Sequence, residues 1–277
     1  MMRRSFAKND SPMIISVIRE RTVRAAIARI KNGEYHGAAG FDLHFSCLDE
    51  QYKNAESIKQ KVDSTAKPIL AINYNQTYDF DEIETDEESR IALLLEAVKA
   101  GVSAVDLPGY TYDLFSKKQF RQEFSHLNYS FIKGNPREIV VDEAIIEKQI
   151  ALIEKIHKMG AEVLLSVHPS IPMNTEQVLE LALFLEKRNP DLIKIVTLCT
   201  NEDELVESFK TMITLKRKVK TRTHFHCCGE AGKLSRIINP ILGGYLVFCS
   251  DGFTESSNFE QLDLQTAVEA INLLKRF

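Results

Sequence analysis

The chain has 277 residues, of which 44% are apolar and 27% are charged, and its formal net charge is -4. This composition is typical of a soluble globular protein with a substantial core. The mild acidity leaves no basic footprint for a nucleic acid, and no apolar stretch approaches the length of a membrane span.

Short apolar runs alternate with amphipathic stretches from one end of the chain to the other. The predicted strands span residues 13–18, 41–45, 68–74, 104–107, 162–168, 192–198, 221–228 and 244–249. The predicted helices span residues 21–31, 49–62, 86–100, 142–159, 175–188, 202–216, 231–242 and 264–276. Eight strand and helix pairs with short connections predict an α/β fold, a (β/α)8 TIM barrel that forms a single domain over residues 1–277.

One segment interrupts this alternation. Residues 108–141 are too many for a strand-to-helix loop and include seven aromatic side chains. Gly134 and the pair Asn135-Pro136 indicate a turn, so we expect a helix and a strand inserted after the fourth barrel strand. Such an insertion would cover one side of the barrel mouth, or contribute to the active site or to a subunit contact.

The cysteines indicate a reducing environment. At least four of the five lie in apolar strand-like runs, and their spacing matches neither a small disulfide scaffold nor a zinc ribbon. Residues 1–12 contain no apolar core of a signal peptide. We therefore expect free thiols and a cytoplasmic protein.

Lys194 is the one charged residue in the apolar run 192–198. Burial of an amine disfavours its charged form and lowers its pKa, which is how a lysine becomes a nucleophile that forms a Schiff base. The alternative is a lysine at a strand edge whose head reaches water. His168 ends the preceding strand, and the ends of neighbouring barrel strands share one face. The pair predicts an amine nucleophile beside an imidazole acid and base, although a lone histidine there is often structural.

With these residues the chain resembles the type I 3-dehydroquinate dehydratases, the Schiff-base enzymes of the shikimate pathway, from about Met13 to the C-terminus. Ser166-Val167-His168 matches the Ser-x-His motif of the acid/base histidine, and Lys194-Ile195-Val196 matches the motif of the Schiff-base lysine. Residues 228–236 match the segment Met-Gly-x-x-Gly-x-x-Ser-Arg.

The resemblance also implies substrate-binding roles near the C-terminus. Arg236 would bind the substrate carboxylate, and Ser257 and Gln261 would lie on a loop that closes over the substrate after strand eight. The resemblance further implies a catalytic cycle without a metal or an organic cofactor, a cyclic hydroxy-keto carboxylic acid as substrate, and a homodimer.

The first half of the chain departs from the family pattern. Asp42 and His44 stand where the family has Glu-x-Arg, and Tyr74 stands nearest to another arginine. Asp106 is kept, whereas Pro108 replaces a glutamate. His226 and Cys228 also occupy positions of family methionines, so the chemistry is matched more completely than the substrate pocket.

Three alternatives follow from these departures. The same lysine and histidine could act on a different carbonyl compound. A metal could bind if the shared face of His224, His226 and Cys228 on strand seven and that of Asp42, His44 and Ser46 on strand two both point into the barrel mouth. Finally, the barrel could be a non-catalytic binding protein whose ligand affinity does not depend on Lys194.

Overall fold

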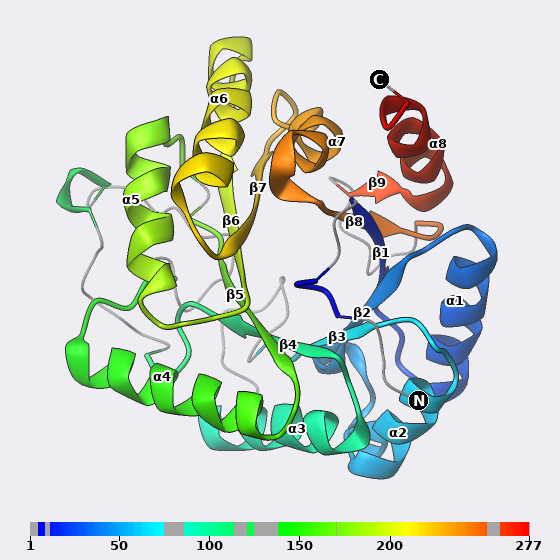
Figure 1. Cartoon of the computed structure of the whole chain (residues 1–277). Helices are drawn as coiled ribbons and strands as arrows, with labels where there is room; N and C mark the ends of the chain where they lie inside the picture. Colours follow the sequence, from blue (N-terminus) through cyan, green and yellow to red (C-terminus); the bar gives the residue numbers. More distant parts are fainter. Residues whose placement is uncertain are drawn as a thin grey trace.

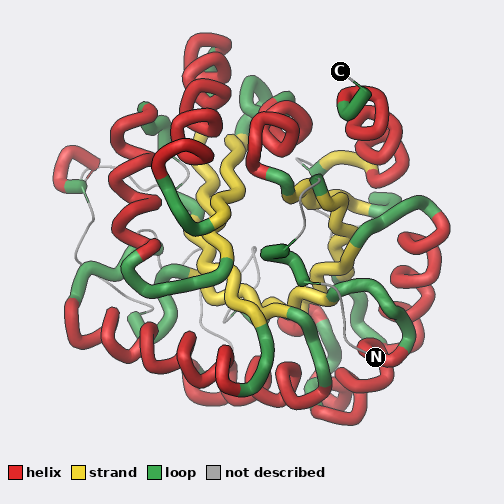
Figure 2. The backbone as a smooth tube through the Cα atoms, in the orientation of Figure 1, coloured by secondary structure: helices red, strands yellow, loops and turns green. Residues whose placement is uncertain are grey.

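The computed structural model describes residues 5–8, 12–74, 86–113, 121–124, 138–169, 171–253 and 261–276. Parallel strands form a curled sheet in the centre, and the helices surround it (Figure 1). Figure 2 shows the strands as a ring enclosed by helices. The predicted TIM barrel is therefore confirmed.

The strands follow one another around the barrel in the order β7-β6-β5-β4-β3-β2-β1-β8-β9. Their bounds are β1 (Met13–Ile18), β2 (Gly40–His44), β3 (Ile69–Ile72), β4 (Ala104–Pro108), β5 (Glu162–Val167), β6 (Leu192–Leu198), β7 (Arg222–Cys228), β8 (Leu246–Ser250) and β9 (Leu262–Asp263). Within the described residues no strand ladder joins β7 to β8. Side chains lie across this seam, where the rings of His224 and Phe248 have centroids 5.5 Å apart.

Every described α-helix except α7 begins where a polar side chain caps the first turn. Their bounds are α1 (Val23–Tyr35), α2 (Ala55–Asp63), α3 (Glu87–Ala100), α4 (Glu143–Lys158), α5 (Thr175–Glu186), α6 (Glu202–Lys218), α7 (Ser235–Asn239) and α8 (Leu264–Leu274). The side chains of Asn174 and Asn201, for example, accept hydrogen bonds from backbone N–H groups of α5 and α6.

Two helices are much shorter than the sequence predicted. The stretch 49–62 begins with a 3-10 turn at Glu50–Tyr52 and becomes α-helical only at Ala55, because the Asn54 side chain accepts a hydrogen bond from the Ser57 N–H and caps the helix there. The stretch 231–242 contains the short helix α7, which a π-helical turn at Pro240–Gly244 follows. Gly243 has a φ of 135° inside that turn, a backbone conformation that favours glycine.

The barrel interior is apolar at the end where the strands begin. The side chains that fill it include Met13, Ile15, Leu70, Leu164, Leu192 and Phe248. The N-terminal residues 5–8 lie across this end (Figure 1). There Phe6 is buried, and the Glu162 carboxylate at the start of β5 accepts hydrogen bonds from Ser5 and from the backbone of Phe6 and Ala7. This end is closed, so a site open to solvent lies where the strands end.

Most of the segment predicted as an insertion lies outside the described residues. Residues 109–113 form a turn after β4, a 3-10 turn spans Gln122–Phe124, and residues 138–141 lead into α4. No described helix combines the length and the apolar content needed to cross a bilayer.

Candidate active site

Polar side chains of β5, β6 and β7 face the barrel interior. Alternate residues of a strand face one side of the sheet, and the apolar neighbours of Lys194, Ile193 and Ile195, pack outward against the helices. Lys194 therefore faces inward. Ser166 is opposite Lys194 on β5, and His224 is opposite Lys194 on β7.

The surroundings of Lys194 differ from the sequence prediction in one respect. Its side chain is half-buried rather than enclosed in the apolar run. β6 lies between β5 and β7, so Lys194 is not on an edge strand of the sheet. The Lys194 Nζ lies 4.5 Å from the centre of the Phe248 ring, which belongs to the other side of the seam.

His168 is held by a carboxylate that the sequence analysis did not identify. The His168 Nδ1 lies 3.2 Å from the Glu138 Oε2, and the same oxygen accepts a hydrogen bond from the His168 backbone N–H. Burial lowers the pKa of His168, and Glu138 partly offsets this effect. A neutral His168 donates from Nδ1 to Glu138, so its basic lone pair is on Nε2. His168 is thus arranged as a proton acceptor.

Gly109 allows Glu138 to approach β5. A Cβ atom on Gly109 would lie 2.4 Å from both the Glu138 carbonyl oxygen and the Val167 Cγ1, which is far closer than van der Waals contact. The segment that carries Glu138 therefore packs directly against the backbone of Gly109, where any side chain would clash.

We expect the substitution Gly109→Ala to displace this segment. The added methyl group has no space, and overpacking of this kind lowers the free energy of unfolding by about 1–3 kcal/mol. Urea denaturation of the variant and of the wild type measures the loss. Superimposable unfolding curves would show that the segment does not need this close approach.

Asp106 faces the same interior from β4. Its Oδ1 accepts a hydrogen bond of 2.5 Å from the Ser166 hydroxyl. Burial raises the pKa of Asp106 to about 7, against the opposing effect of the Lys194 charge. Asp106 therefore binds a proton in the folded protein at pH values where an unfolded chain has lost it, since the usual pKa of aspartate is about 3.9.

This shift predicts a pH-dependent stability. The folded state holds the extra proton between about pH 4 and pH 7, so this group makes the protein less stable as the pH rises through that window. Asp106→Asn keeps the acceptor for Ser166 and removes the titration. Relative to the wild type, the variant is expected to gain about 2–3 kcal/mol between pH 5 and pH 8 in urea unfolding. Asp63→Asn, at an exposed position of α2, is the control, and an equal difference at both pH values would contradict the assignment.

The residues that replace the family pattern on β2 and β3 lie together. The His44 Nε2 is 3.2 Å from the Asp42 Oδ2, and both side chains are buried. The rings of His44 and Tyr74 have centroids 5.8 Å apart. Burial lowers the pKa of His44, and Asp42 opposes this effect. These three residues form one polar wall of the mouth.

The segment before Arg236 is fixed by two glycines and a serine. A Cβ atom on Gly229 would lie 2.5 Å from the Cys199 carbonyl oxygen, and one on Gly232 would lie 2.5 Å from the Cys228 carbonyl oxygen. The Ser235 hydroxyl donates to the Gly232 carbonyl and accepts from the Cys227 N–H. This turn joins α7 to the end of β7. It leaves the Arg236 side chain 7% exposed.

Gln261 lies on the other side of the mouth beside an arginine that the sequence analysis did not identify. The Gln261 Oε1 accepts hydrogen bonds from the Ser250 hydroxyl at 2.9 Å and from the Arg19 Nη1 at 3.3 Å. An arginine side chain only donates hydrogen bonds, so the Gln261 amide oxygen faces Arg19. The Gln261 amide nitrogen is then available as a donor to a ligand. Arg19 follows β1 and continues the inward alternation of Met13, Ile15 and Val17. Ser257 lies outside the described residues.

The positions predicted as a possible metal site form hydrogen bonds instead. The Cys228 thiol donates to the Thr197 carbonyl, and both ring nitrogens of His224 have partners. Among the described residues no three histidine, cysteine or acidic side chains are grouped as metal ligands. A metal at His224 would have to displace one of its hydrogen bonds.

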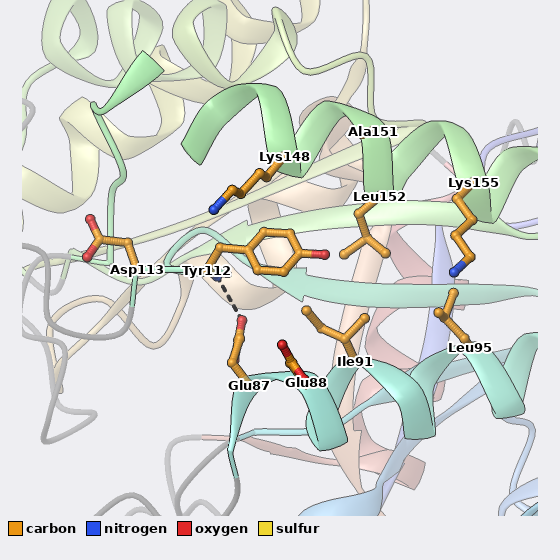
Figure 3. Close-up of a pocket in the computed structure, with 10 residues that line it drawn as sticks. All are labelled: Glu87, Glu88, Ile91, Leu95, Tyr112, Asp113, Lys148, Ala151, Leu152 and Lys155. Carbon is orange, nitrogen blue, oxygen red and sulfur yellow. Dashed lines mark hydrogen bonds between the residues drawn. The ribbon is translucent and has the colours of Figure 1, made fainter. Parts of the chain in front are cut away.

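A separate groove of about 800 Å³ lies on the outside of the barrel between α3 and α4 (Figure 3). Its floor is apolar, with Ile91 and Leu152 facing each other across it. The Tyr112 N–H donates to the Glu87 Oε1 at 2.8 Å at one end. None of the site residues predicted from the sequence lines this groove. The candidate active site is therefore the mouth of the barrel.

Comparisons with known proteins point to one family. The sequence model of the type I 3-dehydroquinase family matches residues 115–277, which is more than half of the chain. A 3-dehydroquinate dehydratase of Coxiella burnetii is 33% identical over 110 residues, and this match spans 38% of the chain and 45% of that protein. A 3-dehydroquinate dehydratase of Desulfotalea psychrophila is 25% identical over 208 residues, which are 73% of the chain and 74% of that protein.

Solved structures share the fold at low sequence identity. The 3-dehydroquinate dehydratase of Geobacillus kaustophilus superposes with a TM-score of 0.76 at 12% identity, and covers 97% of this chain and 93% of its own. The type I enzyme of Clostridium difficile, solved with covalently modified comenic acid, has a TM-score of 0.73 at 16% identity, with coverage of 97% and 94%.

The matched region separates the two halves of the site. It contains His168, Lys194 and Arg236, whereas the wall formed by Asp42, His44 and Tyr74 lies before it. The chain belongs to the type I 3-dehydroquinase family.

Proposed function

We propose that the protein is a lyase that dehydrates 3-dehydroquinate to 3-dehydroshikimate through a Schiff base on Lys194. One observation carries the proposal. An inward-facing amine and a histidine held by a carboxylate converge at the open end of the barrel, and the charge of Lys194 is close enough to lower the pKa of His168.

The mechanism follows from this arrangement. The Lys194 amine attacks the substrate ketone and, with loss of water, forms an iminium that withdraws electrons from the adjacent carbon. The His168 Nε2 removes a proton from that carbon, and the resulting imidazolium is stabilised by Glu138. His168 then returns the proton to the departing hydroxyl group. Hydrolysis of the iminium releases the unsaturated ketone and restores Lys194, so the cycle requires no metal or organic cofactor.

Three groups would hold the substrate. Arg236 would bind the carboxylate through paired hydrogen bonds, as a planar guanidinium does. The Gln261 amide nitrogen would donate to a substrate oxygen, and Ser257 would act from the same loop. Asp42, His44, Tyr74, His226 and Cys228 would form the remaining wall.

A steady-state assay with 3-dehydroquinate tests this function. The product is a conjugated ketone and absorbs ultraviolet light, so its formation is followed directly. Suppose that the purified protein does not turn over 3-dehydroquinate but forms a borohydride-trapped adduct with another ketone. This result would exclude 3-dehydroquinate as the substrate and would retain the Schiff-base reaction.

The second candidate is a family member that acts on a different carbonyl compound. It is favoured by the polar wall of Asp42, His44 and Tyr74, which differs from the family pattern. A site that hydrogen-bonds its substrate rejects compounds with a different arrangement of polar groups. Trapping with a panel of hydroxylated keto acids separates this candidate from the first.

We also propose a setting for the enzyme. All five cysteines are free, which suits a reducing compartment such as the cytoplasm. A single barrel domain over residues 1–277 and a homodimer remain expectations from the sequence and the family.

A further inference from the structure

Two histidines of β7 form a chain of hydrogen bonds across the seam of the barrel. The His226 Nδ1 lies 2.9 Å from the His224 Nε2, and the His224 Nδ1 lies 3.2 Å from the Gly244 carbonyl oxygen. Both side chains are buried, with exposed fractions of 2% for His224 and 4% for His226. The π-helical turn Pro240–Gly244 brings this carbonyl to the seam.

The Gly244 carbonyl determines which nitrogen of each histidine ring donates a hydrogen bond and which accepts one. The Gly244 oxygen only accepts, so the His224 Nδ1 carries a hydrogen. Burial lowers the pKa of His224 to about 3, and burial together with the Arg236 charge lowers the pKa of His226 well below its usual value. Both rings are therefore neutral. The His224 Nε2 is then an acceptor, the His226 Nδ1 is the donor, and the His226 Nε2 has a lone pair.

This chain of hydrogen bonds is not a proton shuttle. A shuttle needs a proton acceptor at each end, but the carbonyl at the inner end is not protonated in the pH range of folded proteins. Any rotation of His224 would leave its buried nitrogens without partners, at an energetic cost. The arrangement instead holds the His226 ring in one tautomer and one orientation.

His226 is close enough to the groups assigned to chemistry and to carboxylate binding for their charges to act on it. It is opposite Val196, two residues beyond the Lys194 and His224 pair in the direction of the open mouth. The charges of Arg236 and Lys194 act on its ring. Among the described residues the His226 Nε2 has no hydrogen-bond partner. A bound ligand could therefore donate a hydrogen bond to this nitrogen.

We propose that the His226 Nε2 is a fixed hydrogen-bond acceptor for a hydroxyl group of the substrate, positioned by His224 and Gly244. The site would then select hydroxylated keto acids over keto acids that present only carbonyl or carboxylate oxygens to this nitrogen, because two acceptors repel each other. The proposal rests on the proposed function for the roles of Lys194 and Arg236, and it adds a specificity residue that those roles do not require.

The first test is nitrogen-15 NMR of the full chain without ligand. Both His224 and His226 are expected as the neutral tautomer with hydrogen on Nδ1, unchanged between pH 5 and pH 8. A hydrogen on the Nε2 of His226, or titration of His226 in this range, would overturn the proposal before any substrate is added.

The second test compares two probes by borohydride trapping on Lys194. One probe is 3-dehydroquinate, and the other is 3-oxocyclohexane-1-carboxylate, which keeps the ketone and the carboxylate but has no hydroxyl group. His226→Met is expected to weaken apparent binding of 3-dehydroquinate about 5- to 10-fold, the scale of one hydrogen bond, and to leave the hydroxyl-free probe unchanged. His226→Gln, which offers an amide oxygen, is expected to recover part of the loss.

The outcomes separate this proposal from the proposed function. Equal effects of His226→Met on the two probes, or no effect on either, would overturn the role of His226 and retain the Schiff-base reaction. If the wild type traps neither probe, the proposed function fails and the substrate named here fails with it.

Discussion

Replacement of Lys194 by alanine is expected to abolish turnover of 3-dehydroquinate and to eliminate the borohydride-trapped adduct. Loss of a covalent nucleophile lowers kcat by about 10⁴-fold or more, because no neighbouring group can form the same intermediate. The side chain is half-buried and faces the barrel mouth, so its truncation leaves the outer core between strands and helices intact. Mass spectrometry of the reduced protein locates the adduct, and the assay gives kcat.

Lys194→Arg and Lys158→Ala complete this experiment. Lys194→Arg keeps the positive charge but forms no imine, so equal inactivity of the arginine and alanine variants assigns the effect to the amine rather than to the charge. Lys158 is an exposed lysine at the end of α4, and its alanine variant is expected to retain wild-type activity. An adduct on another residue, or turnover by Lys194→Ala above one per cent of the wild type, would contradict the mechanism.

The fold was predictable because the local sequence of each strand and helix indicates its type. Apolar runs of strand length alternate with amphipathic stretches, and side-chain caps such as Asn174 set where helices begin. The differences arise where tertiary contacts decide the backbone. The stretch 231–242 has a helical pattern, yet the turn at Gly229 and Gly232 packs against the carbonyls of Cys199 and Cys228 and delays the helix to Ser235.

The candidate site was predictable to the extent that it lies on strands. Lys194, His226 and Asp42 alternate with outward-facing residues, so parity and strand order bring them together. The same parity on β1 would have indicated Arg19. Glu138 had no such signal, because it comes from a segment without periodicity, and the Gly109 contact that places it joins residues 29 positions apart in sequence.

Glu138→Gln is expected to lower kcat about 10²- to 10⁴-fold, the range found when the group that orients a catalytic histidine loses its charge. The amide keeps the size of the side chain and still accepts a hydrogen bond, but it no longer stabilises the imidazolium that forms when His168 takes a proton. Glu138 opposes the lowering of the His168 pKa. The variant should therefore move the acid limb of kcat/KM to lower pH while the KM for 3-dehydroquinate changes little.

The pH profile distinguishes this role from a structural one. A carboxylate that only held the segment at Gly109 would change the stability of the protein and leave the acid limb of the profile in place. Glu154→Gln, at an exposed position of α4, serves as the matched control, with wild-type kcat and an unchanged profile expected. Because Glu138 comes from the segment after β4, a shifted profile would also show that this departure from regular alternation supplies part of the catalytic apparatus.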